Sequence, residues 1–519
     1  MPDNDVQAIV IGAGHNGLVT AAYLARAGLS TMLLEARASV GGTAGSEAFS
    51  GATVNICNCD HLTFRTTPVI DELGLAEHGL RYLDVEPSQL NMTWADPRPW
   101  PSMHSVDATI EVLGLLHPRE VEGYRRYLKA ALPAVRLVFD AANEPPTVAG
   151  LTRRALAHRL AGVPTLLTWS RRSAADVMRS FFETEALRSP GLAVGPMVWG
   201  ISPETPRSGL GALTYAMRHA TRVGRPVGGS GAVPDALLKA FLSFGGELRT
   251  SSAVSRILCD DVGVRAVVLD DGTEIATGTV VSACDPRRTF VEWLDHPPPQ
   301  AAGLVRRWSA RPHAQGYESK IDAIVSAVPR LRALDDPIYS RLGLDMSVPT
   351  TVITPSLAQM DRGARLMAAR QILERPGMLV NVPTALDPSM APPGSHVFSL
   401  EAIYTPYDFA GGWNDDTEPK RWLHQFATLV DPGFLESIGP WRVVTPPVYE
   451  RDFHLPAGHA TSFAGGPLAA LRNKDPELTK YETAIRGLYL TGAATFPGAG
   501  VWGASGRNAA TVVLHKLGV

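Results

Sequence analysis

Three glycines and one glutamate near the start of the chain have the spacing of a dinucleotide-binding turn. Gly12, Gly14 and Gly17 form a GxGxxG sequence, and Glu35 follows 18 residues after the last of them. Glycine permits a tight turn and a close backbone approach to a pyrophosphate, and a carboxylate at that distance can accept hydrogen bonds from ribose hydroxyls. The alternative is a purely structural glycine turn, which the position of Glu35 disfavours.

The flanking sequence predicts the elements that would hold this turn in place. Residues 6–11 are apolar and rich in β-branched side chains, as in a strand buried on both faces of a parallel sheet. Apolar residues then recur with helical spacing over 18–25, and Gly28 suits the end of that helix. A second strand is expected over 31–34. The predicted order is therefore strand, glycine turn, helix, strand and acid.

A second glycine pair favours a flavin cofactor. Gly41 and Gly42 come six residues after Glu35, in the sequence ASVGGTAGS, and their backbone can approach the same pyrophosphate from the other side. This pair resembles the one that follows the ribose-binding acid in flavoproteins of the amine oxidase and phytoene desaturase superfamily. FAD is therefore the expected cofactor, and a plain NAD-dependent dehydrogenase is the less favoured alternative.

Two later segments of the chain are predicted to belong to the same nucleotide-binding domain. A glycine-rich start at 228–231 leads into an amphipathic helix, a hairpin turn is expected at 270–272, and the strands are expected over 247–250, 254–258, 264–269 and 280–282. Near the C-terminus a strand over 487–491 precedes a run of small residues and a helix over 509–517. Small residues let a planar ring lie against the chain, and a helix start offers N–H dipoles to developing negative charge.

The three glycine-rich segments occur in an order typical of one family. The opening IGAGHNGLVTAAYLARAG, the central VVSACDP and the ending GAATFPGAGVWGASGRNAA resemble phytoene desaturase-related FAD oxidoreductases. The nearest branch holds the animal pyridine nucleotide-disulfide oxidoreductase domain-containing protein 2 and the desaturase-like β-carotene ketolases. The resemblance implies an α/β fold with a Rossmann-like FAD-binding domain and a discontinuous α+β substrate domain. It places the FAD-binding domain at 1–74, 221–290 and 441–519, and the substrate domain at 75–220 and 291–440.

The resemblance also implies which residues contact FAD. Val254 would border the adenine through its backbone. The full set is Gly12, Gly14, Gly17, Glu35, Ala36, Gly41, Gly42, Thr43, Val254, Gly492, Gly500 and Val501. Three positions depart from the usual pattern: Thr43 stands where many relatives have arginine, residues 492–494 lack an aspartate found in many FAD folds, and Phe496 replaces a frequent histidine.

Candidates for handling a proton lie in segments that the resemblance places near the flavin. They are His61, His454, His459 and Tyr407, with Trp502 as a further polar neighbour. Histidine and tyrosine side chains can polarise a substrate or accept a proton. For each of them a hydrogen-bonded structural role is the alternative. No metal site is expected, since the 14 histidines include no HExxH sequence.

The leading hypothesis is an FAD-dependent dehydrogenase or oxidase that desaturates or otherwise oxidises an apolar or amphipathic organic substrate. A bound flavin accepts hydride from a substrate carbon, and O2 or a quinone would then reoxidise it. Carotenoid ketolation and amine oxidation stay open as alternative reactions. A flavin-binding partner protein without catalytic activity is the alternative from another class.

Composition limits the class of protein and of partner. The chain is 45% hydrophobic and 19% charged, as in globular proteins, and its net charge of −3 makes nucleic acid an unexpected partner. Four cysteines without a CxxC pair fit a reducing cytoplasm, and Asp3 and Asp5 do not suit an export signal. The uncharged run 487–506 has the length of a membrane span, but its six glycines and one proline indicate a loop-rich site.

One stretch points to a membrane surface. Residues 151–178 interleave arginines with large apolar residues, a pattern that can lie on an anionic bilayer and collect an apolar substrate from it. The side chains concerned are Arg153, Arg154, Arg159, Arg171 and Arg172 with Leu156, Leu160, Leu166, Leu167 and Trp169. A solvated face of a domain helix is the alternative.

Overall fold

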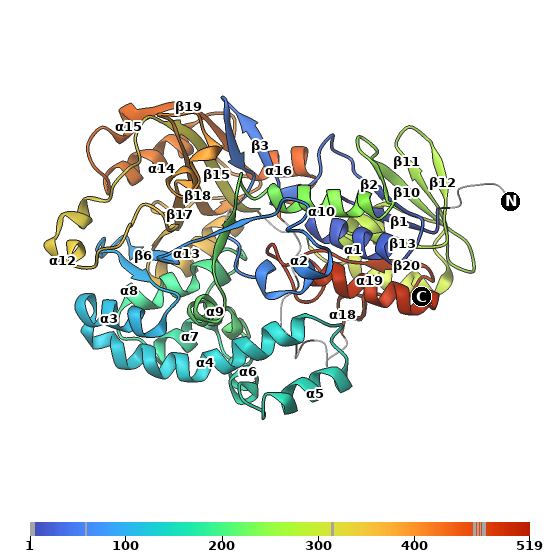
Figure 1. Ribbon diagram of the computed structural model, residues 1–519, viewed down its shortest axis with the longest axis horizontal. Coiled ribbons are helices and arrows are strands. Elements are labelled where there is room, and N and C mark those ends of the chain that lie inside the picture. The colour runs from blue at the N-terminus through green and yellow to red at the C-terminus, as the bar shows by residue number, and fades with distance from the viewer. Residues whose placement is uncertain are drawn as a thin grey trace.

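A five-stranded parallel sheet carries both ends of the chain, at the right in Figure 1. The computed structural model describes residues 6–57, 60–312, 316–459, 463, 467, 469 and 474–519, so Asp3, Asp5 and Cys59 lie outside the described residues. The strands run in the order β20 (Leu488–Leu490), β13 (Val280–Ser282), β1 (Ala8–Ile11), β2 (Thr31–Leu34) and β9 (Glu247–Arg249). Three segments that lie hundreds of residues apart thus build one sheet.

Both faces of this sheet are covered. Ile9 at its centre pairs with Val280 on one side and Met32 on the other, and all three are buried. On one face α1 lies against two other helices; the three are α1 (His15–Arg26), α10 (Ala232–Ser243) and α19 (Ala504–Leu517). The other face packs on a four-stranded sheet in the order β12 (Glu274–Ala276), β11 (Val264–Leu269), β10 (Val254–Cys259) and β14 (Leu294–Asp295). Short, continuously apolar strands are typical of such covered parallel sheets.

A seven-stranded mixed sheet forms the second layer, at the left in Figure 1. Its order is β19 (Ile438–Val444), β15 (Gly316–Val325), β18 (His396–Pro406), β17 (Met378–Asn381), β16 (Thr351–Thr354), β6 (Gln89–Thr93) and β7 (Trp100–Ser102). Strands β16 and β6 are parallel, and the other neighbours are antiparallel. The longest strands of the sheet are β15 and β18, which pair with each other next to the β19 edge.

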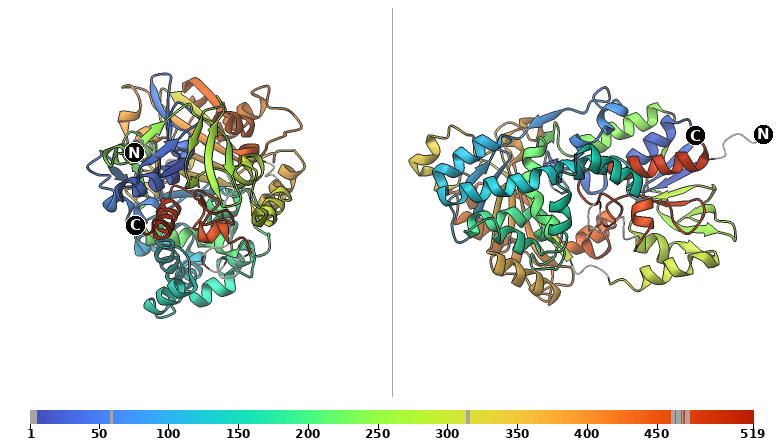
Figure 2. Two further views of the ribbon diagram at one scale, coloured as in Figure 1. Left: turned by 90° about the vertical axis from the view of Figure 1, so that its right-hand side faces the viewer. Right: turned by 90° about the horizontal axis from the view of Figure 1, so that it is seen from below.

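Helices pack below the larger sheet in Figure 1, and Figure 2 shows them from below. The helix α4 (Val121–Ala142) anchors this group through Tyr124 and Tyr127, which are buried among other aromatic rings. Its neighbours are α3 (Val106–Leu116), α5 (Val148–Ala157), α6 (Val163–Trp169), α7 (Ala174–Arg179), α8 (Glu185–Arg188) and α9 (Thr214–Ala220). Among the described residues no helix is both long and apolar enough to cross a membrane.

The remaining elements connect the two layers or cover their edges. The helices are α2 (Val69–Glu72), α11 (Ala302–Ser309), α12 (Pro337–Ser340), α13 (Leu357–Ala368), α14 (Thr417–Ala427), α15 (Phe434–Ser437), α16 (Pro446–Phe453) and α18 (Glu477–Lys480). The short strands are β3 (Ser46–Phe49) with β4 (Ala52–Asn55), and β5 (Tyr82–Asp84) with β8 (Gly224–Pro226).

The predicted α/β fold is confirmed, and the differences are shifted helix starts and an additional strand. The helix α1 begins at His15, inside the glycine motif, because Gly14 takes the extended conformation that precedes a helix. The helix α19 begins at Ala504, five residues before the expected start, directly after the left-handed Gly503. Strand β12 was not expected. The divisions of the chain into domains stay predictions.

The contact between α1 and α19 tolerates no side chain at Gly506. A Cβ atom there would lie 2.3 Å from the Asn16 carbonyl oxygen and 2.9 Å from the Cβ of Val19. We therefore expect Gly506→Ala to lower the free energy of unfolding by about 1–3 kcal/mol, as overpacking does. The midpoint of urea unfolding measures this.

A matched control is Gly114→Ala, within α3, where an added Cβ meets no atom within 4 Å. This change should raise the free energy of unfolding by roughly 0.5–1 kcal/mol, because alanine loses less backbone entropy on folding. Equal midpoints for both variants and the unaltered chain would contradict the assigned packing.

Candidate functional site

Two glycine turns lie against each other at the carboxyl end of β1. The N–H of Gly41 donates a hydrogen bond of 2.8 Å to the carbonyl of Ala13. Gly12 and Gly41 have φ of +97° and +110°, a conformation that favours glycine. A Cβ on Gly17 would lie 1.9 Å from the Gly12 oxygen, whereas one on Gly14 would meet nothing within 4 Å. The motif therefore packs tightly on its helix side and leaves open space beside Gly14.

Glu35 is held at the end of β2 by backbone donors. It is 8% exposed, and its two carboxylate oxygens accept hydrogen bonds from the N–H groups of Ala13, at 2.8 Å, and Arg37, at 2.9 Å. The carboxylate therefore has a fixed position next to the first glycine turn. Each oxygen keeps a second lone pair for another donor.

The two turns border a cavity of about 340 Å³. This volume lies in the range of small-molecule sites, ~300–1,000 Å³. The predicted cofactor residues that line it are Gly12, Gly14, Gly17, Glu35, Ala36, Gly41, Gly42, Thr43, Val254 and Gly492. Gly500 and Val501 are not lining residues: the backbone of Gly500 hydrogen-bonds with His15, and the Val501 carbonyl accepts from the Thr63 hydroxyl at 2.9 Å. The structure thus brings most of the predicted set together, from both ends of the chain.

Other lining residues were missed by sequence reasoning. The guanidinium of Arg37 lies 4.4 Å from the centre of the Phe453 ring, and that of Arg288 donates to the His454 carbonyl at 3.2 Å. Arg37 comes only two residues after the predicted ribose-binding Glu35, and this short spacing could have indicated that Arg37 also lines the cavity. Phe453, on the remote helix α16, gives no local signal. Both guanidinium groups lie at the cavity wall, where Arg37 also pairs with Glu47 at 2.7 Å and Arg288 with Glu292 at 3.5 Å.

Two histidines lie near the glycine turns, and of these His61 is buried and His15 is half-buried. His61 is 2% exposed, and its ring nitrogens hydrogen-bond with the hydroxyls of Tyr82 and Ser230, both at 2.8 Å. Burial, together with the nearby His15, lowers the pKa of His61 to about 3. Burial lowers the pKa of His15, which lines the cavity, to about 4. Both imidazoles are therefore neutral near pH 7.

The other predicted proton-handling residues lie in different surroundings. His454 lines the cavity, and partial burial and Arg288 lower its pKa. His459 and Tyr407 are not lining residues: the His459 ring meets the edge of Tyr317, and a hydrogen bond to Glu450 raises the pKa of Tyr407 to about 12. The structure thus does not bring the four candidates together at this cavity.

Trp502 lies in the glycine-rich segment before α19 and contacts the helix α4. Its ring is 7% exposed and meets the edge of the Phe139 ring of α4, with centroids 6.1 Å apart. Among the described residues its indole N–H finds no hydrogen-bond acceptor. A buried donor of this kind normally has a partner, so this N–H is available to a bound molecule.

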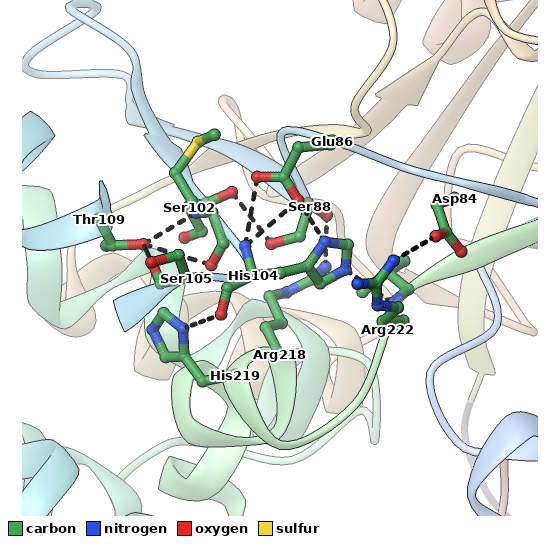
Figure 3. A network of polar contacts seen from close by, with 12 residues as sticks. Asp84, Glu86, Ser88, Ser102, His104, Ser105, Thr109, Arg218, His219 and Arg222 are labelled. Atoms are coloured by element: carbon green, nitrogen blue, oxygen red, sulfur yellow. Dashed lines mark hydrogen bonds and ion pairs between the residues drawn. The ribbon is translucent and has the colours of Figure 1, made fainter. Parts of the chain in front are cut away.

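A polar network fixes the segment that faces His61 (Figure 3). Arg218, at the end of α9, donates to the Ser88 carbonyl at 2.6 Å, and Arg222 pairs with Asp84 at 2.8 Å. Figure 3 shows these contacts around β5 and the start of α3, with Glu86, Ser102, His104, Ser105, Thr109 and His219. Strand β8 begins directly after this network, and its first residue accepts the N–H of His61 at 2.9 Å. The network therefore helps to position His61.

A buried group of charged side chains lies where β15 and β18 meet residues 55–57. Lys320 stands opposite Glu401 in the sheet and donates to the Asn55 carbonyl at 2.8 Å, while the Cys57 thiol donates to Glu318 at 3.3 Å. Burial raises the pKa of Glu318, and burial together with Glu318 holds the pKa of Glu401 well above its usual range. One oxygen of Glu401 has no hydrogen-bond partner among the described residues. In its protonated form such a carboxyl can donate a hydrogen bond.

Comparison with known proteins agrees with this geometry. Residues 17–309, more than half of the chain, match the family model "Flavin containing amine oxidoreductase". The mouse pyridine nucleotide-disulfide oxidoreductase domain-containing protein 2 is 29% identical over 99% of this chain and 94% of its own length.

Two bacterial enzymes are also similar over nearly their whole length. A limonene dehydrogenase subunit of Castellaniella defragrans is 28% identical, over 98% of this chain and 95% of its own. A lycopene-forming phytoene desaturase of Pseudescherichia vulneris is 27% identical, over 98% and 99%.

Solved structures show the same fold at lower identity. Putrescine oxidase with bound putrescine superimposes with a TM-score of 0.62 at 14% identity, over 98% of both chains. That likeness concerns the fold alone. The family model covers more than half of the chain, so the chain belongs to the flavin-containing amine oxidoreductase family.

Proposed function

We propose that this oxidoreductase binds FAD and uses it to desaturate or otherwise oxidise an apolar or amphipathic organic substrate. The observation that carries the proposal is the cavity bordered by both glycine turns, the fixed Glu35 carboxylate and Gly492 from the other end of the chain. Open space beside Gly14 leaves room for a pyrophosphate near the N-terminus of α1, where N–H groups lack intrahelical partners.

Each part of the cavity suits one part of FAD. Glu35 would accept the ribose hydroxyls, and the turns at Gly14 and Gly42 would hold the pyrophosphate through backbone N–H groups. The guanidinium groups of Arg37 and Arg288 would supply the positive charge that Thr43 does not. When bound, FAD supplies the hydride acceptor for the substrate, and O2 or a quinone would take the electrons onward.

The chain's own polar groups would orient the substrate and hold a proton. His61 and His15 are neutral near pH 7, so we assign them hydrogen bonding to neighbours and not proton storage. Glu401, with its raised pKa, would keep a proton beside residues 55–57 and could hold a polar group of the substrate. The roles of His454, His459 and Tyr407 in proton transfer stay predictions.

The reaction we favour is desaturation of a carbon–carbon bond. Its support is the full-length similarity to a phytoene desaturase and to a limonene dehydrogenase subunit, whose names refer to hydrocarbon substrates. Amine oxidation is the second candidate, supported by the description of the family model. FAD-loaded protein is mixed with candidate substrates first without oxygen, where a C=C indicates desaturation and an imine indicates amine oxidation. The mixture is then repeated with O2, which supplies the oxygen atom of a ketone and so reveals ketolation.

The first test is the cofactor itself. Protein reconstituted with FAD should be yellow, should bleach with dithionite and should recover its colour in air. Failure of the protein to bind FAD on reconstitution would overturn the proposal. A bound flavin that neither dithionite nor any substrate reduces would favour the flavin-binding partner protein without catalytic activity.

Removing the charge of Glu35 should weaken FAD binding. We expect Glu35→Gln to raise the Kd for FAD about 10–100-fold, since a hydrogen bond to a charged group contributes ~1.5–3 kcal/mol. Quenching of FAD fluorescence by the apoprotein measures this. The control is Glu247→Gln, an exposed carboxylate on the neighbouring strand β9 that does not line the cavity. Equal loss in both variants would contradict the role of Glu35.

The lowered pKa values of His15 and His61 predict that the free energy of unfolding falls in acid. Their pKa values in the folded chain, about 4 for His15 and about 3 for His61, lie below the ordinary value of 6.5. Below pH 6.5 the unfolded chain therefore binds more protons, and stability falls until the folded-state values are reached. Each histidine contributes a slope of up to ~1.4 kcal/mol per pH unit.

The variant His61→Gln should have a shallower slope between pH 6.5 and 4, measured by urea unfolding at several pH values. The exposed histidine variant His296→Gln is the matched control and should leave the slope unchanged. An unchanged slope in His61→Gln would show that this imidazole is not buried as a neutral group.

A further inference from the structure

Three arginines line a cavity that lies outside the cofactor site. The cavity has a volume of about 450 Å³, and its walls come from residues 64–66, from α4 and from the turn between α9 and β8. We call it the arginine cavity, and its lining residues are Arg65, Thr66, Arg136, Phe139, Ala220, Thr221 and Arg222. The cofactor cavity has a different set of lining residues.

Two of the three arginines share one carboxylate. Asp84, at the end of β5, accepts a hydrogen bond from Arg65 at 2.6 Å on one oxygen and from Arg222 at 2.8 Å on the other. Figure 3 shows the pair of Arg222 and Asp84. Each guanidinium group spends one of its five N–H donors on this carboxylate, so both keep donors for a bound molecule.

The third arginine, Arg136, adds a charge that no acid balances. It lies on the exposed side of α4 and forms no ion pair within the described part of the chain. Asp140, one turn further along α4, pairs with Arg154 and His158 instead. Three guanidinium groups and one carboxylate therefore give the arginine cavity a net charge of +2.

The wall of the arginine cavity is held in place by contacts of its own. The guanidinium of Arg65 lies 5.2 Å from the centre of the Tyr82 ring. The hydroxyls of Thr66 and Thr221 donate to main-chain carbonyls at 2.7 and 3.0 Å. Because these hydroxyl protons are already used, the guanidinium groups are the side-chain donors that the lining residues offer to a ligand.

The opposite side of the arginine cavity is apolar. Phe139 and Ala220 line it, and the Phe139 ring is fixed by the edge of the Trp502 ring, with centroids 6.1 Å apart. The volume is also larger than a phosphate group needs and lies in the range of small-molecule sites, ~300–1,000 Å³. The shape and lining therefore suit an anion that carries an organic group.

We propose that the arginine cavity binds an organic phosphate monoester. A phosphate monoester carries a charge of about −1.5 to −2 at pH 7 and three acceptor oxygens, which match three guanidinium forks and a net charge of +2. A carboxylate or a phosphodiester carries only one negative charge. The organic group of the ligand lies against Phe139 and Ala220. This site is separate from the cofactor cavity and does not rest on the reaction proposed above.

Calorimetric titration of the full chain with phenyl phosphate at pH 8 and low salt tests the proposal. Saturating FAD is present, so that the cofactor cavity is occupied. The unaltered chain should bind one phenyl phosphate, and Arg136→Gln should raise the Kd about tenfold, because a hydrogen bond to a charged group is lost. This variant should stay folded, since Arg136 is exposed and has no ion pair among the described residues.

The matched control is Arg125→Gln, an exposed arginine of the same helix that does not line the cavity. It removes the same charge and should leave the Kd unchanged. Failure of the unaltered chain to show saturable binding would overturn the proposal. An equal loss of affinity in both variants would also overturn it, because only the overall charge of the protein would then matter.

Two further ligands test the chemical class. Methyl phenyl phosphate is a diester with one negative charge, as in a lipid headgroup, and should bind about tenfold more weakly than phenyl phosphate. Inorganic phosphate lacks the ring and should also bind about tenfold more weakly. Equal affinity for the diester would contradict a monoester site. Equal affinity for inorganic phosphate would contradict the role assigned to Phe139 and Ala220.

Discussion

Direct backbone contact between the first and the last helix is the constraint on which the rest of the structure depends. At their crossing the Thr20 hydroxyl donates to the Gly506 carbonyl at 3.0 Å, and the Gly506 N–H donates to the Asn16 side chain at 3.3 Å. Helices approach this closely only where glycine removes the side chain. This crossing fixes α19 and the glycine run before it against the opening turn. The cavity therefore has its walls in place only when both ends of the chain have met.

Burial is the common cause of the unusual electrostatics around that cavity. It lowers the pKa values of His15 and His61, which are therefore uncharged near pH 7, and together with Glu318 it raises the pKa of Glu401, opposite Lys320 in the sheet. Asp60 is the contrasting case, because the buried guanidinium of Arg225 at 2.7 Å holds the pKa of its carboxyl below the usual value despite burial. Buried polar groups near the cavity thus differ in charge according to whether an opposite charge lies beside them.

Sequence patterns were informative where the signal is local. The strands at 8–11, 31–34 and 280–282 follow from apolar runs, and ten predicted cofactor residues that line the cavity follow from glycine spacing and from the family resemblance. The group at Glu318 and Glu401 could not be found this way. Strand β15 carries charged residues that are usually exposed, yet both its faces are buried, and the partners of Glu318 come from segments far away in sequence. Helix starts were misplaced because single left-handed or extended glycines decide them.

The edge strand β20 has a consequence for how the protein matures in a cell. Its three residues complete the parallel sheet beside β13, and they leave the ribosome after every other strand of that sheet. A nascent chain therefore carries an open sheet edge and an incomplete cavity throughout most of its translation. A polypeptide cut short before this strand would lack the wall of the cavity that contains Gly492, so the cavity is complete only once the C-terminal segment has been synthesised.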